Sequence, residues 1–322
     1  MQETAQLVSK VLVLNDDAEL RDHIKALCEA HHLIPVKPQA GAALSVLKSN
    51  VELGAIFLQE SYSGEEGNAL DLARAFHAIR PELPIFLHRE AQSNLDDLPD
   101  VYRGIFTAAY TIATIDDLGA LISKSIFSLQ YPNALVRGIT EITKSTLESQ
   151  FKGVEVSTEA PYMVRDRIIY GELFTLIPLE SSWCRGYMML QTEEQPLIDY
   201  VDDGRTFSVR ESANFRDINH VMGEVTNLVW GAFKNRYISG EPVDWRLSQV
   251  PLIVNHQHRY ISFGSEDPQL CFRYTLTDVN GKLTPLVVYQ RFVFNLSWSP
   301  EKFKENEVLT EDLFDSGELE LF

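Results

Sequence analysis

Residues 219–234 read NHVMGEVTNLVWGAFK, and a helix here would set two different faces side by side. Positions three and four apart share a stripe on a helix, so one polar face would hold His220, Glu224, Asn227, Gly231 and Lys234. The opposite face would be apolar, with Ile218, Val221, Met222, Val225, Leu228, Val229 and Ala232. We therefore predict an amphipathic helix in which the Glu224 carboxylate and the Asn227 carboxamide stand one turn apart and point the same way.

Two interpretations of that polar face are open. Most amphipathic helices simply keep such a face in water. Gly223 and Gly231 weaken this interpretation, because a glycine in a helix interior costs about 1 kcal/mol relative to alanine. Either the helix packs closely on its own sheet through the glycines, or a partner molecule comes close at Gly231. A carboxylate and a carboxamide at this spacing favour chemistry done on another molecule.

The N-terminal half alternates strand-like and helix-like segments. Residues 10–14 form a continuous apolar run that ends in Asn15, Asp16 and Asp17, as a buried parallel strand does when its carboxyl end opens on a site. Further strands are expected near 34–36, 55–58, 85–87 and 107–112. Helices are expected after Asp17 and near 41–49, 67–79, 97–104 and 116–129. This alternation predicts an α/β fold with a five-stranded parallel sheet, whose ligands bind beyond the carboxyl ends of the strands.

The C-terminal half follows a different pattern. The residues between the halves are Gln130-Tyr131-Pro132-Asn133, and the proline ends the preceding helix. A long helix should begin at Ala134, followed by strands over 167–179 and 185–191. Alternating residues from 270 to 276, then Asn280-Gly281, indicate a hairpin with a return strand over 286–296. We predict an α+β domain with an antiparallel sheet and long helices over 134–298, and an acidic tail over 299–322 that is either a solvated end or a docking segment.

Composition excludes several classes of function. The 322 residues fit two domains, and the formal charge of −18 disfavours nucleic acid as a partner. The chain has no run of about 20 apolar residues to span a membrane, and its first residues lack a secretion signal. We expect a cytoplasmic protein. The three widely separated cysteines predict buried hydrophobes rather than a zinc site or a disulfide framework, and no metal or cofactor of its own is expected.

Residues 222–234 resemble the signature helix of the chemotaxis phosphatase CheX and its CheC relatives, in which Glu, Asn, Gly and Lys recur at these spacings. The resemblance extends over 134–298, and the single Glu…Asn helix favours the CheX branch. It implies removal of aspartyl phosphate from a separate receiver, CheY. Asn227 would orient the attacking water, Glu224 would engage a lysine of the partner, and Mg²⁺ would belong to the partner. Members of this family can pair through sheet edges, so a homodimer is expected by resemblance.

Residues 8–130 resemble a response-regulator receiver domain of flavodoxin-like fold, with altered chemistry. The alignment puts Asn15 and Asp16 at the family's acid pair and Gln59 at the phosphorylated aspartate, with His88 near the switch hydroxyl and Ala113 near the usual lysine. A carboxamide cannot form an acyl phosphate. A register shifted by one residue would put Glu60 at the acceptor position, but Gly64 anchors the register that selects Gln59. The resemblance implies a pseudo-receiver that takes no phosphate.

Two functions from different classes remain. The chain is a phosphatase acting on a CheY-like receiver, with the pseudo-receiver as a regulatory or targeting module. Alternatively, it is an adaptor that binds a phosphorylated receiver without turnover. The pair Glu224 and Asn227 favours catalysis, because a docking surface needs no water-orienting amide. Trp230, beside Gly231, adds bulk that favours the adaptor. Gln59 argues against self-dephosphorylation.

Overall fold

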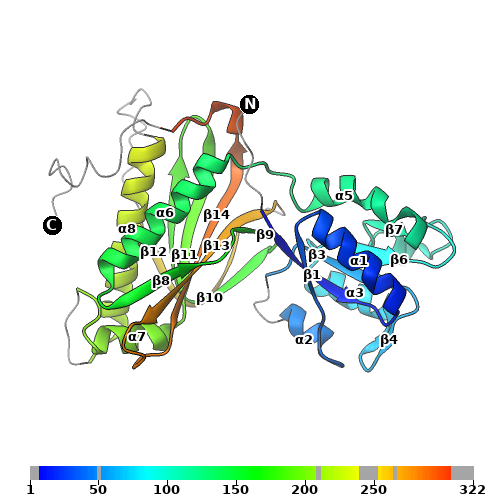
Figure 1. The fold of residues 1–322 in the computed structure, drawn as a ribbon, viewed down its shortest axis with the longest axis horizontal. Coiled ribbons are helices and arrows are strands. Elements are labelled where there is room, and N and C mark those ends of the chain that lie inside the picture. Colours follow the sequence, from blue (N-terminus) through cyan, green and yellow to red (C-terminus); the bar gives the residue numbers. More distant parts are fainter. Residues whose placement is uncertain (1–6, 49–51, 208–211, 239–252, 264–266, 306–322) are drawn as a thin grey trace.

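Two β-sheets organise the chain in a computed structural model that describes residues 7–48, 52–207, 212–238, 253–263 and 267–305 (Figure 1). The smaller sheet is parallel and belongs to the N-terminal half. The larger is antiparallel and belongs to the C-terminal half. The α/β domain followed by an α+β domain is therefore confirmed.

The parallel sheet has five strands in the order β2-β1-β3-β6-β7. Its strands, in chain order, are β1 (Ser9–Leu14), β2 (Leu33–Val36), β3 (Ala55–Gln59), β6 (Ile85–His88) and β7 (Ala108–Tyr110). The helices are α1 (Ala18–Ala30), α2 (Ala43–Lys48), α3 (Ala69–Ile79), α4 (Asp100–Arg103), the 3-10 helix η1 (Ile112–Asp117) and α5 (Leu118–Ser125). A short hairpin, β4 (Ser63–Gly64) with β5 (Gly67–Asn68), precedes α3. The last predicted helix is thus divided into a 3-10 part and an α part.

The antiparallel sheet has the order β12-β10-β11-β14-β13-β8, and β9 also pairs with β13. Its strands are β8 (Val154–Thr158), β9 (Tyr162–Val164), β10 (Ile168–Glu180), β11 (Cys184–Thr192), β12 (Val254–Ser262), β13 (Gln269–Asp278) and β14 (Leu286–Trp298). The helices are α6 (Asn133–Gln150), α7 (Glu194–Asp202), α8 (Phe215–Tyr237) and the 3-10 helix η2 (Pro300–Lys302). The predicted hairpin strands are present, whereas β8, β9, β12 and α7 were not predicted.

The core of the second domain lies between its sheet and two long helices. Helices α6 and α8 contact each other, and their apolar residues join those of β10, β11, β13 and β14 in one cluster (Figure 1). The apolar side of α6 is buried, with Leu135, Ile139, Ile142 and Leu147 along it. The cysteines Cys28, Cys184 and Cys271 are free thiols buried in the cores, as predicted. Apolar burial on this scale is the main force that holds the domain together.

The Asn280-Gly281 signal marks a real hairpin, but its loop is longer than a two-residue turn. The innermost strand pair is Leu276 with Leu286. The Asp278 carboxylate accepts hydrogen bonds from the backbone N–H groups of Asn280 at 3.1 Å and of Lys282 at 2.8 Å. Gly281 has φ of 66°, which glycine adopts without strain. Asp278 therefore organises the loop, because its side chain replaces backbone bonds across the turn.

The first residues of the predicted acidic tail pack on the second domain. Phe303 is buried, with its ring centroid 5.1 Å from that of Trp183 and 5.3 Å from that of Tyr237. Glu305 accepts from Arg236 of α8 at 2.7 Å. The rest of the tail, residues 306–322, lies outside the described residues. The two predicted alternatives for it, a solvated end and a docking segment, therefore concern residues outside the description.

Strand β9 links the two domains. It pairs with β13 of the large sheet, and its Met163 N–H donates to the carbonyl of Val8 at 2.8 Å, just before β1. The Ser9 hydroxyl in turn donates to the Met163 carbonyl at 2.8 Å. The two sheets therefore meet through backbone hydrogen bonds rather than through a free linker.

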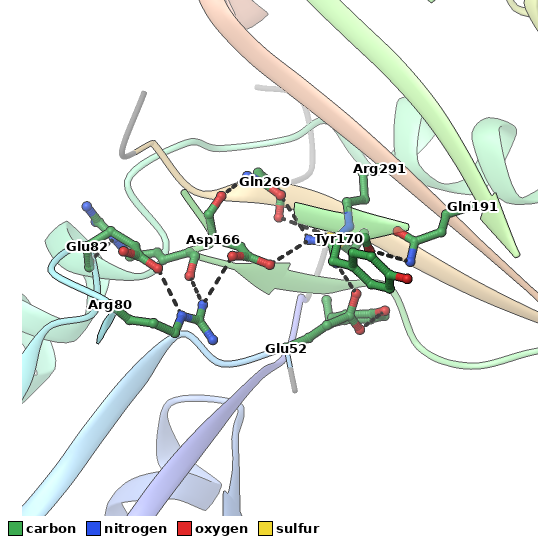
Figure 2. A network of polar contacts seen from close by, with 11 residues as sticks. Glu52, Arg80, Glu82, Asp166, Tyr170, Gln191, Gln269 and Arg291 are labelled. Carbon is green, nitrogen blue, oxygen red and sulfur yellow. Dashed lines mark hydrogen bonds and ion pairs between the residues drawn. The ribbon is translucent and has the colours of Figure 1, made fainter. Parts of the chain in front are cut away.

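A buried charge network lies at the same junction (Figure 2). The Arg291 guanidinium of β14 is 2.9 Å from the Glu52 carboxylate and 3.7 Å from that of Asp166. Arg80 pairs with Glu82 at 2.9 Å and approaches Asp166 at 3.7 Å. Burial raises the pKa of Asp166, against the opposing effect of Arg291 and Arg80. Since buried charges are tolerated only when paired, separating the domains would be costly.

The junction uses one edge of the parallel sheet. Arg165, directly after β9, donates through its side chain to the carbonyls of Glu82 and Ser125, and its N–H donates to that of Leu53. These three residues lie just before β6, at the end of α5 and just before β3. All mark the edge where the parallel strands begin. The opposite edge, where the strands end, therefore points away from the second domain.

Candidate functional site

Helix α8 begins at a well-formed cap. The Asn214 side chain accepts from the Arg216 N–H at 2.8 Å, and Asp217 Oδ2 accepts from the Asn214 N–H at 3.0 Å. These bonds form a capping box, which satisfies N–H groups that the first turn would leave unpaired. The helix then runs for 23 residues, from Phe215 to Tyr237. The predicted helix over 219–234 is confirmed and extends beyond the predicted stretch at both ends.

The two faces of α8 are those that the periodicity predicts. Five of the apolar positions are buried, and Leu228 and Ala232 are half-buried: the buried ones are Ile218, Val221, Met222, Val225 and Val229. Thr226 anchors the same face, since its hydroxyl donates to the Met222 carbonyl at 2.7 Å and also contacts the Thr175 hydroxyl of β10. The sheet thus fixes the rotation of the helix, and with it the direction of the polar face.

Glu224 and Asn227 lie on the face turned away from the sheet. Glu224 is half-buried and Asn227 is exposed. Neither side chain has a hydrogen bond or ion pair among the described residues. A carboxylate and a carboxamide one turn apart are therefore free to bond a molecule that approaches this face.

The two glycines of α8 are not required by the packing of the protein on itself. A Cβ placed on Gly231 would meet no atom of the described residues within 4 Å. One on Gly223 would meet only the Asn255 Oδ1, at an ordinary contact distance of 4.0 Å. Of the two reasons for glycine considered above, close packing on the sheet is therefore excluded for the described residues.

The two ends of the polar face each pair a polar side chain with an aromatic ring. The His220 ring lies 5.6 Å from that of Phe207, in an edge-on arrangement. Lys234 Nζ stands 5.2 Å from the centre of the Trp230 ring, an attractive cation–π geometry. Trp230 is half-buried beside Gly231, so the predicted bulk is present at this end of the face.

A groove of about 490 Å³ runs along the N-terminal part of α8. Its lining comprises Phe215, Arg216, Asn219, His220, Gly223, Glu224, Asn227, Ile253 and Asn255. Asn255 belongs to β12, which pairs with β10. The sequence pattern indicated neither Asn255 nor Arg216 as a site residue. No local sequence signal indicates that a residue of β12 lies beside α8, which precedes it in the chain.

The receiver-like domain brings four of its predicted site residues to the edge where its strands end. Asn15 follows β1, Gln59 ends β3 and His88 ends β6. Gln59 Oε1 accepts from the Asp16 N–H at 3.1 Å, so the carboxamide joins two strand ends. Both polar atoms of the buried Asn15 side chain lack a partner among the described residues. Burial lowers the pKa of His88 despite three nearby carboxylates, which favours its neutral form.

Ala113 follows the carboxyl end of β7 by three positions. It belongs to η1, beyond the end of β7. The residue in register with His88 on the neighbouring strand is Tyr110. The structure therefore brings Tyr110 next to His88 and leaves Ala113 in the following helical turn.

An arginine that the sequence pattern did not reveal occupies the same edge. Arg89 is buried, and its guanidinium contacts the Asp97 carboxylate at 2.5 and 2.8 Å and the Glu60 carboxylate at 3.1 Å. Hydrogen bonds from Arg89 lower the pKa of Asp97 to about 2. The nearby pocket, about 330 Å³ in volume, is lined by Gln59, His88 and Arg89 among others. Arg89, which lines this pocket, is already bonded to the carboxylates of Glu60 and Asp97.

Two absences apply to the part of the chain that the structure describes. No group of three or more His, Cys, Asp and Glu side chains there could hold a metal ion. No helix there is both long enough and apolar enough to cross a membrane.

Comparison with known proteins finds likeness in structure alone. No family model matches the sequence, and no curated protein does either. Two chemotaxis CheX proteins are similar to about half of this chain. The protein of Desulfovibrio desulfuricans is 14% identical in sequence, with a TM-score of 0.36. The match covers 49% of this chain and 99% of that protein. That of Vibrio vulnificus has 16% identity, 49% and 99% coverage, and a TM-score of 0.35.

A receiver domain of a Francisella response regulator is similar to this chain as well. It has 18% identity, 36% of this chain and 93% of that chain covered, and a TM-score of 0.30. The strand order β2-β1-β3-β6-β7 is the flavodoxin-like order, and this α/β domain is joined to an α+β domain with an antiparallel sheet.

Proposed function

We propose that this chain is a cytoplasmic chemotaxis or other two-component signalling protein that hydrolyses the aspartyl phosphate of a separate CheY-like receiver. The observation that carries the proposal is the outer face of α8. It presents Glu224 and Asn227 without partners among the described residues. It also holds two glycines where an added Cβ would meet open space or an ordinary contact. A helix retains such glycines at a cost in stability, and a closely approaching partner supplies the reason.

The chemistry needs little from the phosphatase beyond positioning. Phosphoryl transfer is accelerated mainly by orientation and charge stabilisation. The Asn227 carboxamide holds a water in line with the phosphorus, donating or accepting one hydrogen bond. The Glu224 carboxylate bonds a lysine of the receiver, which fixes the register through a charge-assisted hydrogen bond. Mg²⁺ comes with the receiver, whose own acids bind it, and this chain contributes no cofactor.

The receiver-like domain acts in this proposal as a regulatory or targeting module that takes no phosphate. Gln59 stands at the end of β3 with its carboxamide bonded to Asp16, and an amide nitrogen is too weak a nucleophile to form an acyl phosphate. Arg89 is bonded to Glu60 and Asp97, so its guanidinium is already paired without a phosphoryl group. Homodimer formation through a sheet edge belongs to the same proposal.

One observation favours a second candidate, a non-catalytic adaptor that binds a phosphorylated receiver. Trp230 is half-buried beside Gly231, with the Lys234 ammonium held over its ring. This pair narrows the approach to the C-terminal part of the face. An adaptor would bind through the same helix but would leave the lifetime of the phosphate unchanged.

The deciding experiment follows the decay of radiolabelled phospho-receivers from the same cell. We expect the wild-type chain to accelerate decay of one receiver, and Asn227→Ala and Glu224→Ala each to abolish the acceleration without loss of fold. Glu148→Ala removes an exposed carboxylate of α6 and serves as the matched control with full activity. Unchanged decay of every receiver, in the presence of the folded wild-type chain, would reject the phosphatase and leave the adaptor.

A further inference from the structure

The groove beside α8 extends well beyond the two residues to which the proposed reaction assigns roles. Its N-terminal end is formed by Phe215, Arg216 and His220, and its far wall by Asn255 of β12. Phe215 is 53% exposed, and nearby Phe207 is 39% exposed. Large apolar side chains with this exposure beside a groove are typical of a surface that meets another protein.

The Arg216 guanidinium has no carboxylate partner among the described residues. The chain carries a net charge of −18, yet no described carboxylate forms an ion pair or hydrogen bond with the Arg216 guanidinium. Among the residues that line the groove, the only other fully charged side chain is Glu224. This groove is therefore not acidic, in contrast to the protein as a whole. Its free cation, Arg216, lies about two helical turns from Glu224, on the same stripe of α8.

The position of Arg216 in the helix also disfavours a structural role. It stands in the first turn of α8, where the helix dipole presents positive charge. A cation there is destabilising, whereas an anion would be stabilised. The cap of the helix is already made by Asn214 and Asp217, so Arg216 is not needed to start it. A residue that opposes local preference without a compensating internal contact points to a function outside the chain.

Two amides of the groove have unused hydrogen-bonding capacity. Asn219 donates to the Phe215 carbonyl at 2.7 Å, but its buried Oδ1 has no donor among the described residues. Asn255 has no side-chain hydrogen bond with them either. Such groups suit a partner that presents backbone or side-chain polar atoms, because each needs a bond once water is excluded.

The chemistry of a phosphorylated receiver identifies the occupant. Its aspartyl phosphate and Mg²⁺ require carboxylates at the edge where its parallel strands end. The receiver-like domain of this chain shows how acidic that edge stays even without phosphate, since Asp16, Asp17 and Glu60 all lie there. A partner surface of this charge matches the free guanidinium of Arg216.

We propose that Arg216 is the specificity residue of this groove: it binds a carboxylate at the strand-end edge of the partner receiver, while Phe215 packs on the partner beside it. The inference rests on the proposed function and adds the surface by which the phosphatase selects its receiver. Arg216 takes no part in the chemical step, which belongs to Asn227 and Glu224. It acts on encounter and binding, where charge complementarity has its largest effect.

The test uses the full chain with Arg216→Glu, and Arg21→Glu as the control of equal charge change on an exposed position of α1. Glutamate in a first helical turn is favourable, so the variant should fold. Binding is measured by calorimetry with the receiver activated by beryllofluoride, and turnover by phosphate release from the phospho-receiver. We expect Arg216→Glu to raise Kd and KM about 5- to 30-fold with kcat within about twofold of wild type, and the difference to shrink at high salt.

The outcomes separate this inference from the proposed function. Unchanged Kd and KM in Arg216→Glu, or the same rise in Arg21→Glu, would overturn the inference while leaving the phosphatase intact. A fall in kcat with KM unchanged would also overturn it, because it would place Arg216 in the chemical step. If the wild-type chain binds the activated receiver but does not release its phosphate, the proposed phosphatase activity is rejected. The Kd of Arg216→Glu, compared with the Kd of Arg21→Glu and of wild type, then decides the role of Arg216. Absence of any binding would reject both.

Discussion

Replacing Gly231 of α8 by alanine should stabilise the protein and weaken its activity at the same time. The added Cβ would meet no described atom within 4 Å, so no clash offsets the better helix propensity of alanine. The gain is about 1 kcal/mol in the free energy of unfolding. For a domain of this size that corresponds to a rise in Tm of about 2–4 °C.

The same methyl group should obstruct a partner that lies against the helix. Overfilling a tight contact costs about 1–3 kcal/mol, which lowers kcat/KM roughly 5- to 150-fold at 1.4 kcal/mol per tenfold change. The assay pairs thermal unfolding with decay of the phospho-receiver for the same preparation. Gly104→Ala is the control: it also places a Cβ in space free of described atoms, but in the other domain, and should leave activity unchanged.

Two results would refute this reasoning in different ways. A lower Tm for Gly231→Ala would mean that the glycine is needed for internal packing, contrary to the open space around it. A higher Tm with full activity would mean that no partner backbone approaches at Gly231, and the reason given for a glycine there would be lost. If Gly231→Ala raises Tm and lowers activity, packing inside the chain cannot explain both changes.

The remaining predictions concern the junction and the receiver-like edge. Arg291→Met should destabilise the protein by about 3–5 kcal/mol in denaturant unfolding, because it leaves the buried Glu52 carboxylate without its cation and Asp166 with Arg80 alone. Arg185→Met, which removes an exposed ion pair, should cost at most about 1 kcal/mol. Incubation of the full chain with acetyl phosphate should give no phosphorylated species by mass spectrometry, because Gln59 offers no carboxylate, and a single phosphoryl adduct at this edge would contradict the pseudo-receiver assignment.

The sequence revealed those features that local periodicity controls. The two faces of α8 could be predicted because a helix repeats its environment every three to four residues. The five strands of the parallel sheet could be predicted because each is a short apolar run between polar turns. Their parallel order followed from the helices that separate them. The same reasoning placed Glu224 and Asn227 on the exposed face.

Features that depend on distant pairing could not be predicted in this way. Asn255 reaches the groove only because β12 pairs with β10, and no pattern near residue 255 reports that pairing. Arg291 and Glu52 are separated by 239 positions in the chain, so their contact leaves no local signature. Arg89 follows a buried strand, but its bonds to Glu60 and Asp97 depend on how two loops fold over the strand ends. The tail residue Phe303 likewise packs on side chains far from it in sequence.

The arrangement of the two domains bears directly on whether the chain could act on itself. The joint uses the edge where the parallel strands begin, through Arg165 and its contacts to Leu53, Glu82 and Ser125. The edge that carries Gln59 is the opposite one, and the buried network of Arg291 holds the domains in this relation. Bringing the edge with Gln59 to the outer face of α8 would require breaking these buried ion pairs, at a cost of several kcal/mol. Because Gln59 cannot carry a phosphoryl group, no bond to a phosphoryl group would offset that free energy. The free face of α8 is therefore best matched to a second molecule, and the receiver-like domain is a fixed module of this chain rather than a molecule that binds this face.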